Sequence, residues 1–292
     1  MTPKISAGYS SASRTELPTL GAYHCLLSDL EGDGDLDLVF ANYVNDSTVY
    51  ALDSYLYWNV GGTFSTSNRL SLPTSGARAV NAADLDGNGY QDLVFSNYYN
   101  GSSYTVGLYV YYGDATGYST SRRLTLGVSG PLTAVTIEDI NGDGYLDLLT
   151  AGYYDGDESV NSYIHWGSSS GHSDSNRTTL AGNRTINALV RDFNKDGYKD
   201  VLLGTYYDGD DSTNSYLYWG SASGYSSGSR LSLPSYRVYH MAAVDVDLNG
   251  YLDLVFAHYY DGDYATNSYV YLGSSSGYST SSRISLSTTG SY

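Results

Sequence analysis

The feature that most constrains this chain is a repeat of 53 to 55 residues that covers nearly all of its 292 residues. The segment DINGDGYLD of residues 139–147 has five copies, which begin at Asp29, Asp84, Asp139, Asp192 and Asp245. Self-similarity at a fixed period of this size is the signature of a repeat architecture. No linker or shift in composition separates the units. We therefore expect a single domain over residues 1–292, with units at about 20–73, 74–128, 129–181, 182–234 and 235–288.

Each unit contains four strand candidates separated by turns. In the fourth unit they cover residues 186–190, 198–205, 215–219 and 230–233, and we label them strands A, B, C and D. The chain has 33 Gly and 34 Tyr but only 2 Met, so residues that favour strands and turns dominate. The B strands are apolar on both faces, as a sheet covered on both sides requires. These patterns predict an all-β, five-bladed β-propeller with four-stranded antiparallel blades and a calcium loop between the first two strands of each blade.

A recurring arginine marks the start of each D strand, and its copies outnumber the blades. It stands at Arg14, Arg69, Arg123, Arg177, Arg230 and Arg283. Residues 1–19 therefore predict an extra outer strand that could close the ring and hide a sheet edge. Because the last unit has its own D strand, one strand is surplus. The surplus strand is either displaced from the ring, part of residues that flank the ring, or paired with another chain. The sequence leaves these three alternatives open.

The A–B connection of every unit is an aspartate loop with the pattern D-x-[DNE]-x-[DN]-G-x-x-D. Side-chain oxygens at positions 1, 3, 5 and 9 converge on one centre, the glycine at position 6 permits a sharp turn, and position 7 offers its backbone carbonyl. Such oxygen sets suit a hard cation, and about six ligands on a flexible loop favour Ca²⁺ over Mg²⁺. Without a cation, each group of carboxylates would repel itself.

The loops contain no His or Cys, which disfavours zinc, and they lack the Glu at position 12 that an EF-hand needs. We predict about five structural Ca²⁺ ions, with the following ligands: Asp29, Glu31, Asp33, Asp35, Asp37; Asp84, Asp86, Asn88, Tyr90, Asp92; Asp139, Asn141, Asp143, Tyr145, Asp147; Asp192, Asn194, Asp196, Tyr198, Asp200; Asp245, Asp247, Asn249, Tyr251, Asp253.

In this loop, its place between two strands and its period, the chain resembles the FG-GAP/VCBS repeat family, whose members are integrin-α-type β-propellers with calcium-binding hairpin loops. The resemblance implies the propeller fold and supports the twenty side-chain calcium ligands at positions 1, 3, 5 and 9. It leaves function broad, because such propellers resemble lectins, adhesion modules and parts of polysaccharide-processing proteins. Two features depart from the family: many relatives look seven-bladed, and the Phe-Gly and Gly-Ala-Pro signatures are not evident here.

The B–C connections carry Tyr-Tyr-Asp-Gly-Asp in the last three units, on the side opposite the aspartate loops. Aromatic rings can stack on the C–H faces of a sugar, and carboxylates can accept hydrogen bonds from its hydroxyl groups, so these residues suit a carbohydrate site. Several identical sites on one chain would also gain avidity for a multivalent surface. Solvated turns or a second, weak cation site are the alternatives. The C-strand aromatics are expected to pack between blades. The predicted ligand-binding residues are Tyr154, Asp155, Asp157, Tyr207, Asp208, Asp210, Tyr260, Asp261 and Asp263.

Composition excludes several classes of protein. A formal charge of -17 argues against nucleic-acid binding, and no apolar run is long enough to insert into a membrane. The single cysteine, Cys25, rules out an internal disulfide and is expected to be a small buried residue of the first A strand. The five histidines share no repeat position and no nucleophile motif, so we expect no catalytic residues and no enzyme activity.

Three functional hypotheses remain. The first is a calcium-stabilised, multivalent carbohydrate-binding module of lectin type. The second is an integrin-like adhesion module that binds a surface protein, and the third, least favoured, is a polysaccharide-processing enzyme. Calcium supply favours an extracellular or cell-surface location, although no signal-peptide pattern follows Met1. The oligomeric state and the identity of the glycan or protein partner are left open.

Overall fold

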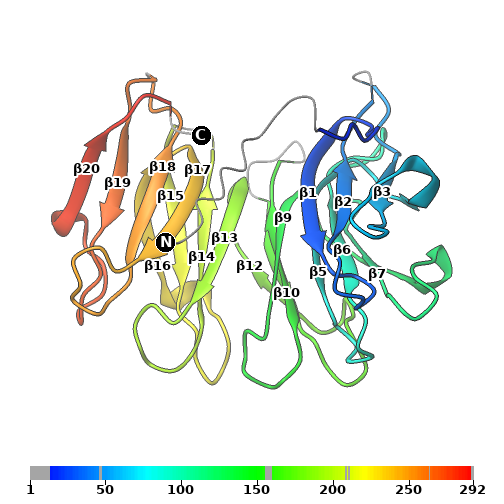
Figure 1. Ribbon diagram of the computed structural model, residues 1–292. Helices are drawn as coiled ribbons and strands as arrows, with labels where there is room; N and C mark the ends of the chain where they lie inside the picture. The colour runs from blue at the N-terminus through cyan, green and yellow to red at the C-terminus, as the bar shows by residue number, and fades with distance from the viewer. Residues whose placement is uncertain are drawn as a thin grey trace, which may run out of the picture.

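Five four-stranded antiparallel sheets make up the chain in this computed structural model (Figure 1). The structure describes residues 14–45, 48–154, 160–207, 209, 211–262 and 264–290. Each sheet consists of four consecutive strands, in the order A, B, C, D. No helix among the described residues is long and apolar enough to cross a membrane.

The strands of the first three sheets have the following bounds: β1 Ala22–Ser28, β2 Asp37–Asn42, β3 Asp53–Tyr57, β4 Arg69–Pro73; β5 Ala77–Ala83, β6 Asp92–Asn97, β7 Leu108–Tyr111, β8 Arg123–Leu126; β9 Leu132–Glu138, β10 Asp147–Gly152, β11 Ser162–His165, β12 Arg177–Leu180. The last two sheets contain β13 Thr185–Arg191, β14 Asp200–Thr205, β15 Ser212–Tyr218, β16 Arg230–Tyr236; β17 Val238–Val244, β18 Asp253–His258, β19 Asn267–Tyr271, β20 Arg283–Ser287.

The strands predicted for the fourth unit are present, with shifted ends. β14 begins at Asp200 rather than at residue 198, because the aspartate loop extends to its ninth position. β15 and β16 are longer than predicted because they continue to pair as far as Ser212 and Tyr236. β16 therefore runs two residues past the predicted end of its unit. Turn chemistry set the predicted ends, whereas strand pairing sets the observed ones.

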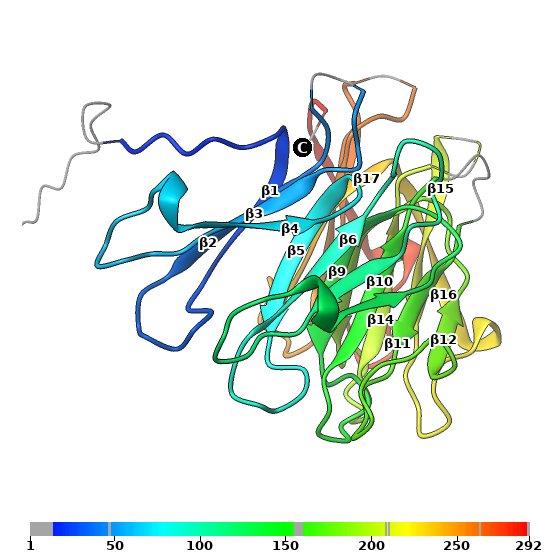
Figure 2. The ribbon, with the colours of Figure 1, turned by 90° about the vertical axis from the view of Figure 1, so that its right-hand side faces the viewer.

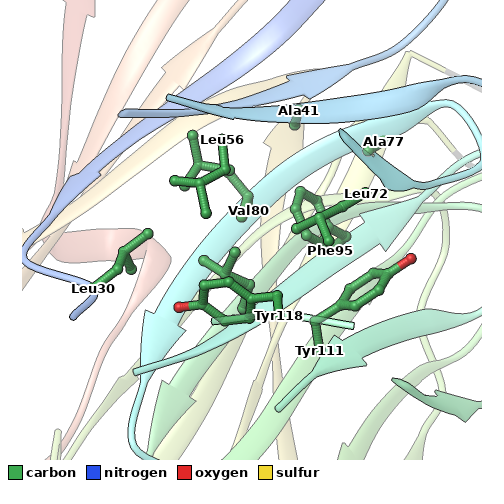
Figure 3. Close-up of a cluster of buried hydrophobic side chains, with 11 residues drawn as sticks. Leu30, Ala41, Leu56, Leu72, Ala77, Val80, Phe95, Tyr111 and Tyr118 are labelled. Carbon is green, nitrogen blue, oxygen red and sulfur yellow. The ribbon is translucent and has the colours of Figure 1, made fainter. Parts of the chain in front are cut away.

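Apolar contact between successive sheets forms the core. At the junction of the first two sheets, Leu30, Leu56 and Leu72 of one sheet pack against Val80 and Phe95 of the next (Figure 3). We call the face of a sheet that packs on the following sheet its front face, and the opposite face its back face. Every residue of β6, β10 and β14 is buried, so the B strands of the inner sheets are covered on both sides as predicted.

Tyrosines of the C strands link the sheets with hydrogen bonds as well as apolar contact. The hydroxyl groups of Tyr111, Tyr218 and Tyr271 each donate to a backbone carbonyl at the end of the preceding D strand, at 2.6 Å. Tyrosine supplies both a large apolar body and this donor, which explains its use at the junctions.

The recurring arginine has a local structural role in all five sheets. As the first residue of a D strand, it places its guanidinium over the ring of a C-strand tyrosine, with distances of 3.7–4.6 Å to the ring centre. Such cation–π contacts hold the outer strand of each sheet onto its neighbour. The pairs are Arg69–Tyr55, Arg123–Tyr109, Arg177–Tyr163, Arg230–Tyr216 and Arg283–Tyr269.

The sheets follow one another round an arc whose two ends are not packed together (Figures 1 and 2). The inner strands pack in the order β1, β5, β9, β13 and β17, and within the described residues β17 does not pack on β1 in the same way. Of residues 1–19, predicted as an extra outer strand, residues 1–13 lie outside the described residues and residues 14–19 form no strand. The Tyr57 hydroxyl donates to the carbonyl of Pro18. Cys25, predicted to be buried, is exposed, because no described strand covers the back face of the first sheet.

The buried imidazole of His258 predicts a pH-dependent contribution to stability. His258 is fully buried, and burial lowers its pKa to about 4 from the usual 6.5. The unfolded chain takes up the proton first, so this stability is complete above pH 6.5. It is lost as pH falls toward 4, by up to about 1.4 kcal/mol per pH unit.

The variant His258→Phe preserves the aromatic contact with Tyr269, whose ring centre lies 4.6 Å away, and cannot titrate. Urea unfolding in chelator at pH 7, 6 and 5 should therefore show that the variant loses less stability than the wild type as pH falls, with a difference in slope of up to about 1.4 kcal/mol per pH unit. Equal slopes for the two proteins would show that His258 does not titrate in this way.

Candidate functional site

The aspartate loops, which join strands A and B, are held in shape by their own first residue. Asp29 accepts the backbone N–H groups of Gly32, Asp33 and Gly34 at 2.8–3.1 Å. The first aspartates of the other four loops accept two or three N–H groups of their own loops in the same way. Position 6 has φ of 89–93° in all five loops, a conformation that favours glycine. The sequence pattern therefore encodes one loop geometry five times.

The ninth position of each loop holds a carboxylate that is almost completely buried. Asp147 accepts the N–H of Ile140 within its loop and that of Gly167 beyond the C strand, both at 2.8 Å. Asp37, Asp92, Asp200 and Asp253 make the equivalent pair of bonds. Each therefore ties the A–B loop to the C–D turn, a structural role that the sequence alone did not indicate.

Burial raises the pKa of Asp92, Asp147 and Asp200 to about 6, and the two backbone N–H bonds of each carboxylate oppose this rise. All three groups are therefore mainly ionised at neutral pH. An ionised buried carboxylate needs donors or a cation, and the two N–H groups supply part of that requirement.

Positions 3 and 5 pair a carboxylate with an amide in four of the five loops. The amide nitrogen of Asn88 donates to Asp86 at 3.2 Å, and that of Asn141 donates to Asp143 at 2.9 Å, so the two residue types exchange places. The fourth and fifth loops contain the same pair. Only the first loop has two acids, Glu31 and Asp33. The expected mutual repulsion of the loop acids is thus reduced by hydrogen bonds within each loop.

Two of the loops bring three carboxylates together in a set that fits a divalent cation. In the second loop, carboxylate oxygens of Asp84, Asp86 and Asp92 all lie within 4.8 Å of one another, as do those of Asp245, Asp247 and Asp253 in the fifth loop. Hard, anionic oxygen donors at this spacing suit Ca²⁺. The position 7 residues donate their N–H groups to the side chain at position 5, and their role as carbonyl ligands stays a prediction.

The opposite side of the arc carries a surface that we call the tyrosine–arginine face. It consists of the first tyrosines of the B–C segments (Tyr43, Tyr98, Tyr153, Tyr206, Tyr259), the second tyrosines Tyr154, Tyr207 and Tyr260, and Arg78, Arg184 and Arg237. The first tyrosines run from sheet to sheet, with ring centres 5.6–6.2 Å apart from Tyr43 to Tyr206, and Tyr239 bridges the last gap.

Arginines alternate with the second tyrosines. The Arg184 guanidinium lies 3.8 Å from the ring centre of Tyr154 and 4.9 Å from that of Tyr207. Arg237 lies 4.9 Å from the ring centres of Tyr207 and Tyr260, and its Nε donates to Asp211 at 2.5 Å. The structure thus brings together three predicted ligand residues that are about 53 residues apart in sequence.

Sequence reasoning missed both arginines, although a signal was present. The residue before each A strand is Gly21, Gly76, Pro131, Arg184 or Arg237 in the five units, and its carbonyl accepts the N–H of the first B–C tyrosine. Arg184 and Arg237 adopt φ of 36° and 32°, where the two glycines have 56°. Arginine at a position that favours glycine indicates a specific use of the side chain.

The remaining predicted ligand residues are less informative. Asp155, Asp157, Asp208, Asp210 and Asp263 lie outside the described residues. Asp261 is exposed beside Tyr260. The nearby guanidinium groups occupy space over the rings of the second tyrosines, so these rings are not simple open platforms for a sugar.

Sequence reasoning also missed a groove of about 550 Å³ between the third and fourth sheets, on the aspartate-loop side. Its walls include Trp166 and Tyr225, whose rings are nearly parallel with centres 6.4 Å apart, and Lys199, whose carbonyl accepts the Tyr225 hydroxyl at 2.6 Å. Its size suits a small ligand.

An FG-GAP-like repeat model matches residues 29–95, 139–203 and 192–256, which is more than half of the chain. Among solved structures, the chain is similar to the V. cholerae biofilm matrix protein Bap1, at 17% identity over 91% of this chain and 39% of that chain, with a TM-score of 0.50. This likeness concerns the fold, and the chain spans well under half of the Bap1 chain.

Two further matches are weaker. One is BBS1N in complex with ARL6DN, at 12% identity over 86% of this chain and 80% of that chain, with a TM-score of 0.43. The other is the Tc holotoxin pore of Photorhabdus luminescens, at 14% identity over 90% of this chain and 12% of that chain, with a TM-score of 0.35. No curated protein matches the sequence.

The buried ninth carboxylate should stabilise the fold even without a metal ion. Asp147→Asn replaces an anionic acceptor of two N–H groups, and we expect it to lower the free energy of unfolding by about 2 kcal/mol in chelator. Asp143→Asn, at the exposed fifth position of the same loop, should change it by less than about 0.5 kcal/mol. Urea unfolding with EDTA measures both, and equal effects of the two substitutions would refute the structural role of Asp147.

Proposed function

The chain belongs to the FG-GAP-like repeat family, and we propose that it is a calcium-stabilised binding module that attaches to a surface partner through the tyrosine–arginine face. The alternation of Arg184 and Arg237 with three tyrosines from successive sheets carries this proposal. Tyrosine and arginine are, with tryptophan, the residue types enriched at the energetic centres of protein interfaces. A row that repeats with the sheets also suits a partner with repeated contacts.

A protein partner is the first candidate, because the arginines lie against the rings that a sugar would otherwise stack on. Arg184 and Arg237 both lie 4.9 Å from the centre of Tyr207. A glycan is the second candidate. It is favoured by Tyr104 and Tyr264, which lie beside this face and are 37% and 53% exposed. Their exposed rings offer flat apolar surfaces for the C–H faces of a sugar.

Calcium would be held by the oxygens at positions 1, 3, 5 and 9 of the aspartate loops, up to one ion per sheet. Each ion would supply positive charge to three or more carboxylates and fix the A–B hairpin. Hydrogen bonds within the loops neutralise part of the carboxylate charge, so we expect the affinity for calcium to be low. Sites of low affinity fill at extracellular calcium levels, which supports an extracellular location. The likeness to a biofilm matrix protein is consistent with such a location. We propose no catalytic role for the chain.

Calcium binding can be tested in the two loops whose carboxylates converge most closely. Asp86→Asn and Asp247→Asn together remove one acid from each, and we expect calorimetry to show two fewer calcium ions bound per chain. A site at hundredfold excess of calcium over its Kd adds about 2.7 kcal/mol to stability, so the variant should also gain less in melting temperature from added calcium.

The matched control is Asp53→Asn, which changes an acid of β3 outside the loops. Unchanged calcium stoichiometry in the double variant would contradict the assignment of the ligands.

The partner can be tested with fluorescent chain on fixed cells treated beforehand with protease or with periodate, which oxidises glycans. The double variant Arg184→Gly with Arg237→Gly should lower binding about tenfold, because it removes both guanidinium groups. Glycine is the native residue at the equivalent positions of the first two sheets, so it suits the backbone there. Val60→Ala is the control, since Val60 is 58% exposed on the C–D turn of the first sheet, on the opposite side.

Binding that is lost after protease and kept after periodate supports a protein partner. The reverse pattern supports a glycan. Equal binding by the wild type and the glycine variant would rule out this face as the contact surface.

A further inference from the structure

The front face of the fifth sheet exposes residues that the other four sheets bury. At position 2 of the aspartate loops, Val246 is 51% exposed, whereas the four equivalent residues are 2–7% exposed. In the D strands, Leu286 is 47% exposed, whereas its equivalents are 1–2% exposed. In each inner sheet the following sheet covers these positions, as it covers Leu30 and Leu72 at the first junction. The fifth sheet therefore has a complete apolar junction surface with nothing described against it.

The back face of the first sheet shows the complementary difference. Cys25 is exposed, whereas the equivalent residues Val80, Val135, Ala188 and Met241 are 0–6% exposed. Leu27, on the same face, is 57% exposed. Phe40, which pairs with Cys25 across the two strands, is partly exposed, while Phe95 and Phe256 in its place are fully buried. Exposed contiguous apolar surface of this kind marks an interaction site.

These two faces are the two halves of one recurrent interface. At the last inner junction, Phe193 and Leu233 from a front face pack with Met241 and Phe256 from a back face. Val246 and Leu286 occupy the first pair of positions in the fifth sheet, and Cys25 and Phe40 occupy the second pair in the first sheet. The front face of the fifth sheet therefore carries apolar residues at the positions that would contact the apolar residues on the back face of a first sheet.

We propose that the chain associates head to tail, with the front face of the fifth sheet in one molecule docked on the back face of the first sheet in a second copy. Continuity with the four inner junctions identifies this occupant, since the contact repeats an interface that the chain already forms. Such a contact is heterologous, so it extends from copy to copy and lines up successive tyrosine–arginine faces. It does not depend on which partner those faces bind.

Residues 14–20 must move for this contact to form. The Tyr57 hydroxyl bonds to Pro18, as Tyr111, Tyr218 and Tyr271 bond to the ends of preceding D strands. The end of an incoming β20 would take the same place. The described segment forms no strand and has few ties, among them the 3.3 Å bond from the Leu20 N–H to Asn42.

A disulfide between copies gives the sharpest test, because Cys25 is the only cysteine in the chain. At the fourth junction, a Cβ at Gly204 would lie 2.8 Å from the sulfur of Met241, which occupies the position of Cys25. Ala257 is the equivalent of Gly204 in the fifth sheet. Ala257→Cys should therefore face Cys25 of the next copy, and mild oxidation of the full chain should give a ladder of disulfide-linked oligomers.

The control for this experiment is Ala257→Cys with Cys25→Ser, which should give no ladder beyond single 257–257 links. If both thiols are oxidised while the chain stays monomeric, the disulfide has formed within one chain. The fifth sheet would then close on the first sheet of its own chain, and the proposal would be overturned. Absence of any link through Cys25 would also overturn it.

Sedimentation of the unmodified chain gives an independent test. Self-association should increase with concentration, and Leu286→Asp should weaken it about tenfold or more, because it places a charge in the apolar contact. Val60→Asp, at a residue that is 58% exposed on a turn of the first sheet, should leave association unchanged. A wild-type chain that stays monomeric at all concentrations, or equal association of the two variants, would refute the contact.

Discussion

Apolar contact between successive sheets is the interaction on which the rest of this structure depends. A four-stranded sheet with two apolar faces cannot be stable alone, so each sheet needs a neighbour on both sides. The fully buried strands β6, β10 and β14 meet this requirement, and the tyrosine hydroxyls that reach the preceding D strand add polar links. The same requirement explains why the two end sheets differ from the inner ones: each has one face without a described neighbour.

The aspartate loops are stabilised at two levels. Backbone N–H groups and side-chain amides already neutralise part of the charge, as the bonds to Asp29 and Asp147 and the Asn88–Asp86 pair show. These hydrogen bonds help to hold the loop shape, and a cation would relieve the remaining charge. This division separates the ninth carboxylate, which joins two turns of a sheet, from the more exposed acids at positions 3 and 5. The ninth carboxylate is therefore expected to contribute to stability both through its two N–H bonds and through any bound ion.

The sequence predicted what local chemistry determines and missed what depends on distant neighbours. Five four-stranded sheets and the loops between their first two strands follow from repeats and turn residues. The exposure of Cys25 could not be predicted, because it depends on whether another sheet covers β1. The hydrogen bond that the Gly167 N–H donates to Asp147 joins residues twenty apart, and the contacts of Arg184 cross from one unit to another. Lining up the five units does place Arg184 and Arg237 where the first two units have glycine, but their contacts with tyrosine become visible only in the structure.

Those two arginines are the strongest sign that the tyrosine–arginine face has a use beyond folding. A positive φ at a residue other than glycine costs about 1–3 kcal/mol. Partly exposed cation–π contacts return about 0.5–1 kcal/mol each, and an accessible ion pair such as Arg237–Asp211 adds at most about 1 kcal/mol. The gains roughly cancel the strain, so glycine would serve the fold about equally well, as it does at residues 21 and 76. Contact with a partner is a reason for arginine at these positions that the fold does not provide.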